Sequence, residues 1–213
     1  SVACGVIGTY VVTRRITLIA GSIAHTVLGG MGAAYYLRVV ANWQWLHPLH
    51  GAIVAALLAA VVISAARMHA REREDTVISA LWAIGMAIGI VFVDLSEGYK
   101  VDLMSYLFGS ILTVPAVDIV IMLVVGLLMI VLVTLYYKDL LALSYDEEFA
   151  QIRGVPTKIL YFLLMAMIAL SVVMVIQVVG LILVIALLTI PPYICEKFSD
   201  SLFEMMFYSV LLN

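Results

Sequence analysis

The sequence predicts an all-α membrane protein, a polytopic bundle of about seven or eight transmembrane helices with at least one short or broken helix. Of its 213 residues, 65% are hydrophobic and only 12% are charged, whereas soluble domains carry about a quarter charged residues. The apolar residues are gathered in long runs, several of them close to the roughly 20 residues that a helix needs to cross a bilayer. None of the runs alternates apolar and polar residues, as the strands of a membrane barrel do.

Charged residues divide the apolar sequence into eight predicted helical segments of one transmembrane domain, 1–213. The first and last segments are shorter than a full span, so the chain is expected to be truncated at both ends. At the start of the fourth segment, Asp75 and Thr76 stand where a helix N-cap is needed. In chain order the segments are 1–12, 16–40, 51–66, 76–93, 115–137, 159–176, 179–190 and a last one that begins near Leu202.

Basic residues fall mainly in every second loop, which predicts the orientation of the chain. The alternate loops hold only Lys100, with Arg38 near one span end. By the positive-inside rule the basic loops are cytoplasmic, and the loops 41–50 and 94–110 face outward. The predicted cytoplasmic set comprises Arg14, Arg15, Arg67, Arg71, Arg73, Lys138, Arg153, Lys158 and Lys197.

Residues 173–193 are expected to contain the broken or half-length helix. Gln177 and Gly180 interrupt this apolar run, and the pair Pro191-Pro192 is expected to end it. Each piece is short for a bilayer core of about 30 Å at 1.5 Å per residue. Because broken backbone is tolerated in a membrane only where protein or a water-filled cavity surrounds it, the break is typical of a transporter.

Several classes of function are excluded by what the sequence lacks. Cys4 and Cys195 are too few and too far apart for a disulfide framework or a metal cluster. The sequence has no basic patch interleaved with aromatic residues, so no nucleic-acid partner is expected. It also has no phosphate-binding loop and no hydrolase motif. We therefore predict no catalytic residues and no tightly bound cofactor, and energy for transport must come from a partner or an ion gradient.

His25 is the residue of chemical interest within the predicted spans. On a helix it shares one face with Gly21, Gly29 and Gly32, because the series Gly21, His25, Gly29 and Gly32 has spacings of four, four and three residues. Small residues on this face let a neighbouring helix or a substrate come close, and neutral imidazole is a common ligand of transition metals. The pattern predicts a metal contact on a transport path, and an interhelical hydrogen bond from His25 fits it equally well.

The predicted cytoplasmic loop 139–158 mixes acidic, basic and apolar residues. Its leucines, with Phe149 and Ile152, are expected to form a short amphipathic surface helix. Asp146 is a suitable N-cap for this helix, and Gly154 is a suitable stop. Such a helix suits docking onto a partner, although a solvated connector explains the composition as well.

Two weaker groups of metal candidates lie in the predicted outer loops. His47 and His50 have the spacing H-x-x-H, and Asp94 and Asp102 contribute to an acidic rim that would attract cations. Ordinary solvated loops explain both groups.

Five stretches of sequence, taken together and in order, resemble the membrane permease subunit of bacterial ABC importers for zinc, manganese or iron. The likeness is closest to zinc-uptake permeases and covers nearly the whole chain. The stretches are VVTRRITLIAGSIAHTVLGG, EDTVISALWAIGMAIGI, VDLMSYLFGSIL, YDEEFAQIRGV and VVGLILVIALLTIPP.

The resemblance implies a homodimer of permeases in the bacterial cytoplasmic (inner) membrane. Two ATP-binding cassette subunits would dock below it, and an extracytoplasmic metal-binding protein would deliver the ion from above. Asp146 opens a match to the family's coupling loop, in which Glu148, Ala150 and Gly154 have the spacing E-x-A-x-x-x-G. This loop would sit in a groove of the ATPase and transmit its closure, and the chain itself would not be an enzyme.

The resemblance also assigns His25 to the family histidine that lines the metal path. Relatives commonly carry an aspartate four residues earlier on the same face, where this chain has Gly21. Without that carboxylate the face offers only nitrogen, which favours Zn²⁺ as the transported ion over the harder Mn²⁺, with Fe²⁺ also open. Two other functions remain alternatives, a permease for a metal chelate such as an iron–siderophore or cobalamin, and a secondary transporter driven by an ion gradient.

Overall fold

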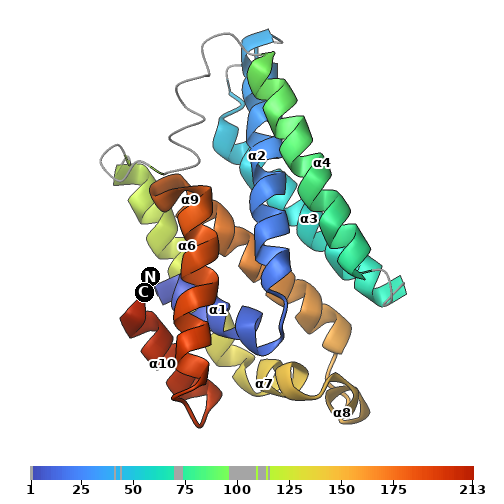
Figure 1. Cartoon of the computed structure of the whole chain (residues 1–213), viewed down its shortest axis with the longest axis vertical. Helices are drawn as coiled ribbons and strands as arrows, with labels where there is room; N and C mark the ends of the chain where they lie inside the picture. The colour runs from blue at the N-terminus through green and yellow to red at the C-terminus, as the bar shows by residue number, and fades with distance from the viewer. Residues whose placement is uncertain are drawn as a thin grey trace.

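The structure, a computed structural model, describes residues 2–40, 42–43, 45–69, 74–95, 109, 114 and 116–213. These residues form helices joined by turns, with no strand among them, which confirms the predicted all-α class. Figure 1 shows the helices gathered into one elongated bundle. They are α1 (Val2–Thr13), α2 (Thr17–Val40), α3 (Pro48–His69), α4 (Glu74–Asp94), α6 (Ala116–Leu135), α7 (Tyr137–Tyr145), α8 (Glu147–Ile152), α9 (Thr157–Glu196) and α10 (Leu202–Leu212).

Among the described residues, four helices are long and apolar enough to cross a membrane: α2, α3, α4 and α9. The pair α6 and α7 makes a fifth candidate if the two, which meet at 73°, are counted as one bent span, and α1 and α10 are shorter apolar helices. The predicted segments therefore coincide with helices, but the sixth and seventh belong to one element, α9.

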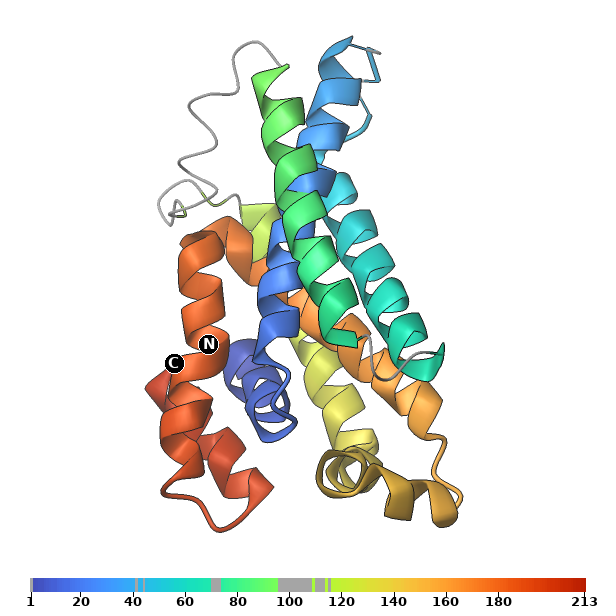
Figure 2. The same cartoon turned by 45° about the vertical axis from the view of Figure 1, so that its right-hand side comes forward.

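Helix α9 is broken at Gly180 into two arms. Gly180 has φ 81° and ψ 167°, a conformation outside the helical region that favours glycine. Figures 1 and 2 show that the two arms run in opposite directions, so that both ends of α9 lie at the same end of the molecule. The second arm, 181–196, spans about 24 Å at 1.5 Å per residue, short of a full bilayer core. The predicted break and the short helix are both confirmed.

The prediction that Pro191-Pro192 ends the helix is wrong, because α9 continues through both prolines to Glu196. Proline has no N–H, so the carbonyl of Leu188 receives no helical hydrogen bond from Pro192. Helix α1 approaches closely at this point, where a Cβ on Gly8 would lie 2.6 Å from the Leu188 oxygen. Tight packing of α1 against the arm thus holds the proline-containing turn in a helical course.

Close backbone contacts hold α2 between α3 and α4. A Cβ on Gly30 would lie 2.3 Å from the carbonyl oxygen of Gly51 in α3, and one on Gly85 of α4 would lie 2.6 Å from the Cα of Thr26. Small residues permit this approach between membrane helices. The predicted cap of α4 is wrong by a residue or two, since the helix begins at Glu74 and Asp75 lies in its first turn.

Most segments that carry the predicted cytoplasmic basic residues lie together, whereas Arg71 and Arg73 lie outside the described residues. Figures 1 and 2 place the α1–α2 turn, α7, α8 and both ends of α9 at the lower end of the bundle. The α2–α3 connection lies at the opposite end. We call the lower end the basic end, and the alternation of basic loops along the chain corresponds to this arrangement.

Candidate metal path

His25 projects from α2 against Trp82 of α4. The two rings stack, with their centroids 4.7 Å apart and their planes at 28°. The Nδ1 atom of His25 is buried and has no hydrogen-bond partner among the described residues. The indole thus fixes one face of the imidazole, while a nitrogen capable of binding a metal stays unused.

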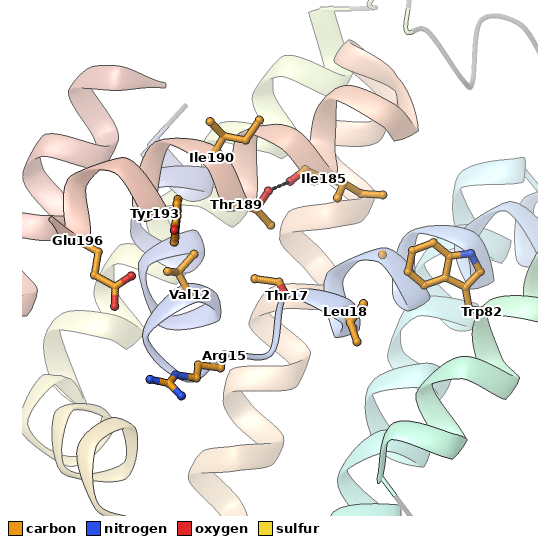
Figure 3. A pocket seen from close by; sticks show the side chains of 11 residues that line it. Val12, Arg15, Thr17, Leu18, Trp82, Ile185, Thr189, Ile190, Tyr193 and Glu196 are labelled. Atoms are coloured by element: carbon orange, nitrogen blue, oxygen red, sulfur yellow. Dashed lines mark hydrogen bonds between the residues drawn. The ribbon is translucent and has the colours of Figure 1, made fainter.

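An open cavity of about 660 Å³ lies at the basic end, lined by residues of α1, the start of α2, α4 and the second arm of α9 (Figure 3). Gly21, one helical turn before His25, and Trp82 both line it. Because Trp82 also stacks on His25, the indole connects the lining of the cavity to the imidazole. A Cβ on Gly21 would lie 2.5 Å from the indole ring, so this glycine makes room for Trp82. Polar side chains that line the cavity are Arg15, Thr17, Thr189, Tyr193 and Glu196.

Gly29 and Gly32 lie on the same face of α2 as His25 but do not line this cavity. A Cβ on Gly29 would lie 2.8 Å from the Gly85 oxygen of α4, and one on Gly32 would lie 3.1 Å from the Gly89 oxygen. These two glycines permit helix packing, and of the three predicted path glycines only Gly21 lines the 660 Å³ cavity.

Among the described residues, the weaker metal candidates His47, His50 and Asp94 do not belong to a group of three potential ligands. The Nδ1 of His50 accepts a hydrogen bond from the backbone N–H of His47 at 3.3 Å, and the Nδ1 of His47 accepts one from the N–H of Leu49 at 3.3 Å. Asp94 is exposed at the end of α4, and Asp102 lies outside the described residues. Within the described part of the chain, no three His, Cys, Asp or Glu side chains could hold a metal together.

The predicted surface helix of the 139–158 loop is in fact two helices, α7 and α8. Asp146 ends α7 and caps α8, accepting a hydrogen bond from the N–H of Phe149 at 2.9 Å. Gly154, with φ 81°, follows the end of α8, as expected of a helix stop. The prediction of a single amphipathic helix is wrong, because the extended backbone at Asp146 interrupts the helical repeat between the leucines and Phe149. The leucines of α7, Leu140 and Leu143, are buried in the bundle.

Helix α8 presents apolar side chains outward. Ile152 is 86% exposed and Phe149 is 48% exposed, whereas Ala150 is fully buried. Glu148 is also exposed. The short helix is thus anchored by its small residue and shows a mixed apolar and acidic surface at the basic end.

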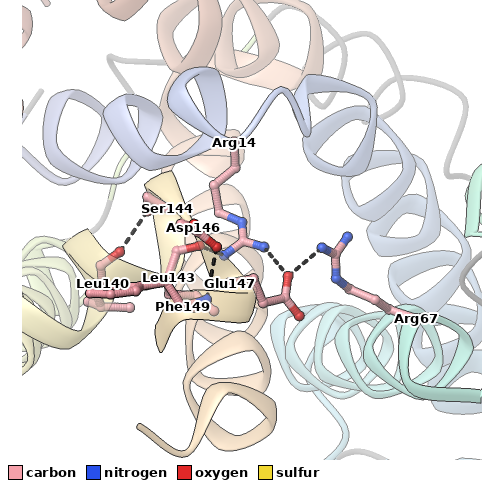
Figure 4. Close-up of polar contacts among 8 residues, drawn as sticks. All are labelled: Arg14, Arg67, Leu140, Leu143, Ser144, Asp146, Glu147 and Phe149. Atoms are coloured by element: carbon pink, nitrogen blue, oxygen red, sulfur yellow. Dashed lines mark hydrogen bonds and ion pairs between the residues drawn. The ribbon is translucent and has the colours of Figure 1, made fainter. Parts of the chain in front are cut away.

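A charged cluster joins α8 to the rest of the bundle (Figure 4). The Oε2 atom of Glu147 accepts a hydrogen bond from Arg67 at 2.7 Å and one from Arg14 at 3.1 Å. Arg14 also donates to the carbonyl oxygen of Leu143 at 2.7 Å. Both guanidinium groups lie over the ring of Tyr161, at 5.3 Å for Arg14 and 4.7 Å for Arg67.

Burial and charge act in opposite directions on this cluster. Burial raises the pKa of the Glu147 carboxyl, but the hydrogen bonds and charges of Arg67 and Arg14 outweigh it, so that the pKa lies below its ordinary value. Burial, followed by repulsion from Arg67, lowers the pKa of Arg14. The carboxylate is therefore ionised at neutral pH and is shared by two cations.

The whole chain, residues 1–213, matches the ABC 3 transport family. It belongs to that family.

Relatives of this ABC 3 chain are membrane proteins. A "probable metal transport system membrane protein" of Chlamydia pneumoniae is 38% identical over 213 residues, covering all of this chain and 72% of the relative. An uncharacterized membrane protein of Synechocystis sp. is 46% identical over 206 residues, which cover 97% of this chain and 71% of the relative. The chain is accordingly a multi-pass membrane protein, as predicted.

A solved structure shares the fold of this ABC 3 chain. PsaBC from Streptococcus pneumoniae, in complex with a Fab, aligns with a TM-score of 0.81 and 32% identity, over 98% of this chain and 72% of that chain. The family predicted from the five sequence stretches is therefore confirmed. Zinc is not singled out, since a relative from Streptococcus parasanguinis, 31% identical over 212 residues (100% of this chain and 73% of its own), is named a manganese import system permease protein.

Sequence reasoning missed two residues of the ABC 3 chain that the structure brings to these sites. Trp82 lies in an apolar run that gives no local sign of a partner on α2. Glu147 lies between the predicted coupling residues Asp146 and Glu148, and its arginine partners are 80 and 133 positions away in the sequence. One signal was available, since both arginines fall in loops predicted to share the cytoplasmic side.

Proposed function

We propose that this chain is the permease subunit of an ATP-driven importer for a divalent transition-metal ion. The observation that carries the proposal is the placement of His25. Its buried Nδ1 has no hydrogen-bond partner among the described residues, and its ring stacks on Trp82, which lines the cavity at the basic end. Family membership and relatives named for metal transport support the class of cargo. The ion would pass His25, and displacement of Trp82 would admit it to the cavity.

We propose Zn²⁺ as the cargo on the chemistry of the donors. Imidazole nitrogen suits Zn²⁺, and Gly21 supplies no carboxylate beside His25. The names of the manganese relatives favour Mn²⁺ as the alternative. A metal chelate is a second alternative, because the cavity of about 660 Å³ has the size of a small-molecule pocket.

The partners follow from the same proposal. Helix α8, with Phe149 and Ile152 exposed, would dock on a separate ATP-hydrolysing subunit, two of which would serve two copies of the permease. An extracytoplasmic metal-binding protein would deliver the ion. The naming of one relative as part of a metal transport system and the PsaBC complex support partners of this kind.

Reconstitution of the complete complex in liposomes tests the proposal. We expect ATP-dependent uptake of radiolabelled zinc, at least tenfold slower in His25→Ala with the complex still assembled. The matched control is His50→Ala, which removes only a local hydrogen bond from the His47 N–H at the opposite end of the bundle and should transport normally. Competition by unlabelled Mn²⁺ or by a zinc chelate identifies the preferred cargo. Unchanged uptake in His25→Ala would remove His25 from the path.

A further inference from the structure

We propose that Glu147 is a positioning residue that transmits movement of the docking helix α8 to α2, the helix that carries His25. The inference rests on the proposed function, in which α8 binds the ATPase. It concerns the contacts that connect the proposed ATPase-binding surface on α8 to the proposed metal path.

The contacts of Glu147 form a clamp with two arms. One carboxylate oxygen accepts hydrogen bonds from both Arg14 and Arg67, and the side chains of the two arginines are only 6% and 19% exposed. Neighbouring acids do not duplicate this contact. Asp146 is engaged as the cap of α8, and Glu148 is exposed.

Both arms of the clamp lead to α2. Arg14 lies in the turn between α1 and α2, three residues before α2 begins at Thr17. Arg67 lies in the last turn of α3, which packs backbone to backbone on α2 where Gly51 meets Gly30. A displacement of α8 would therefore pull on α2 through the α1–α2 turn that leads into it, and also through α3.

Charge keeps these side chains joined in a way that packing alone would not. Two cations share one carboxylate and the face of one aromatic ring, that of Tyr161 in α9. Charge-assisted hydrogen bonds of this kind are short and directional. Without the Glu147 charge, the two guanidinium groups would repel each other, and α8 would lose the ion pairs that join it to the α1–α2 turn and to α3.

The test compares transport with ATP hydrolysis in the complete reconstituted complex, using Zn²⁺ as the ion. We expect the complex with Glu147→Gln to retain its ATPase subunits and to hydrolyse ATP. The amount of Zn²⁺ transported per ATP hydrolysed should be at least tenfold lower than in the wild type. Asp200→Asn, an exposed acid beyond α9, is the matched control and should keep the wild-type ratio. Glu147→Asp, which keeps the charge, should recover part of the ratio.

A double variant separates transmission from general damage. If Glu147 acts through Arg67, then Glu147→Gln with Arg67→Gln should be no worse than Glu147→Gln alone, because one interaction is removed once. Independent, multiplying defects would overturn the proposal, as would a normal ratio in Glu147→Gln. Loss of the ATPase subunits from Glu147→Gln would also overturn it, since Glu147 would then serve docking. Absence of ATP-dependent uptake in the wild-type complex would instead refute the proposed function.

Discussion

The surroundings of His25 and the surroundings of Glu147 hold their helices together by opposite means. Around His25, α2 meets α3 and α4 through glycines, with backbone atoms in contact and a stacked ring pair. Around Glu147, long side chains from α3, α8 and the α1–α2 turn meet and are joined by charge. The first kind of contact fixes the distance between helices. The second tolerates movement, because long side chains can follow their partners.

This difference suggests a division of labour within the permease. A metal path needs helices whose spacing is fixed within a fraction of an ångström, and close glycine contacts provide that spacing. A coupling device must move with a partner outside the membrane, and ionised side chains at the basic end suit this task. The predictions below test the two regions separately, in order of decreasing effect.

The glycine contact between α2 and α3 should be the most sensitive point. Gly30→Leu would force a side chain into the Gly51 backbone, where even a Cβ would lie 2.3 Å from the oxygen. We expect a loss of several kcal/mol or failure to fold, beyond the roughly 1–3 kcal/mol typical of overpacking. Gly126→Leu is the control, because a Cβ at Gly126 meets nothing within 4 Å. Yield and thermal unfolding in detergent measure both, and equal losses would contradict the account.

Trp82 should have the next largest effect, on transport and not on folding. Trp82→Ala removes the ring that lines the cavity and stacks on His25, so we expect preloaded liposomes to leak metal several-fold faster without ATP. Trp82→Phe keeps a ring against His25 and should leak little. Equal leak rates in the wild type and in Trp82→Ala would show that the indole closes nothing.

The Glu147 cluster should add an acid-sensitive part to stability. The pKa of the Glu147 carboxyl is depressed in the folded chain. The carboxylate therefore contributes fully to the free energy of unfolding above its unfolded-state pKa of about 4.3, and this contribution is lost as pH falls through its folded-state pKa. The stability difference between wild type and Glu147→Gln should therefore shrink below about pH 4. Each hydrogen bond to a charged group contributes roughly 1.5–3 kcal/mol. Chemical unfolding across pH measures the difference, and one that stays constant down to pH 3 would contradict it.

Loss of the cap of α8 should have the smallest effect on stability. Asp146→Ala removes the hydrogen bond to Phe149 and should cost about 1 kcal/mol. Ser201→Ala is the matched control, because Ser201 caps α10 through the N–H of Glu204 in the same way. Both variants should lose similar stability, but only Asp146→Ala should bind the ATPase subunit more weakly in a pull-down. Equal binding would move the docking surface away from α8.

Features with a local cause could be predicted from the sequence. The helical segments, the break at Gly180, the cap at Asp146 and the stop at Gly154 depend on residues within a few positions of one another. The course of α9 through Pro191-Pro192 could not be predicted, because it depends on the approach of Gly8 from α1. Trp82 and Glu147 were missed for the same reason, since each acts on residues far away in the sequence.

The central claim is that the ion meets His25 on its way through the chain. Anomalous scattering from crystals of the complete complex, loaded with Zn²⁺ and trapped during turnover, tests it most directly. We predict an ion about 2.0–2.1 Å from a ring nitrogen of His25, with Trp82 displaced from its stacked position. An ion bound elsewhere in the membrane, with the His25 ring still packed against Trp82, would contradict the account.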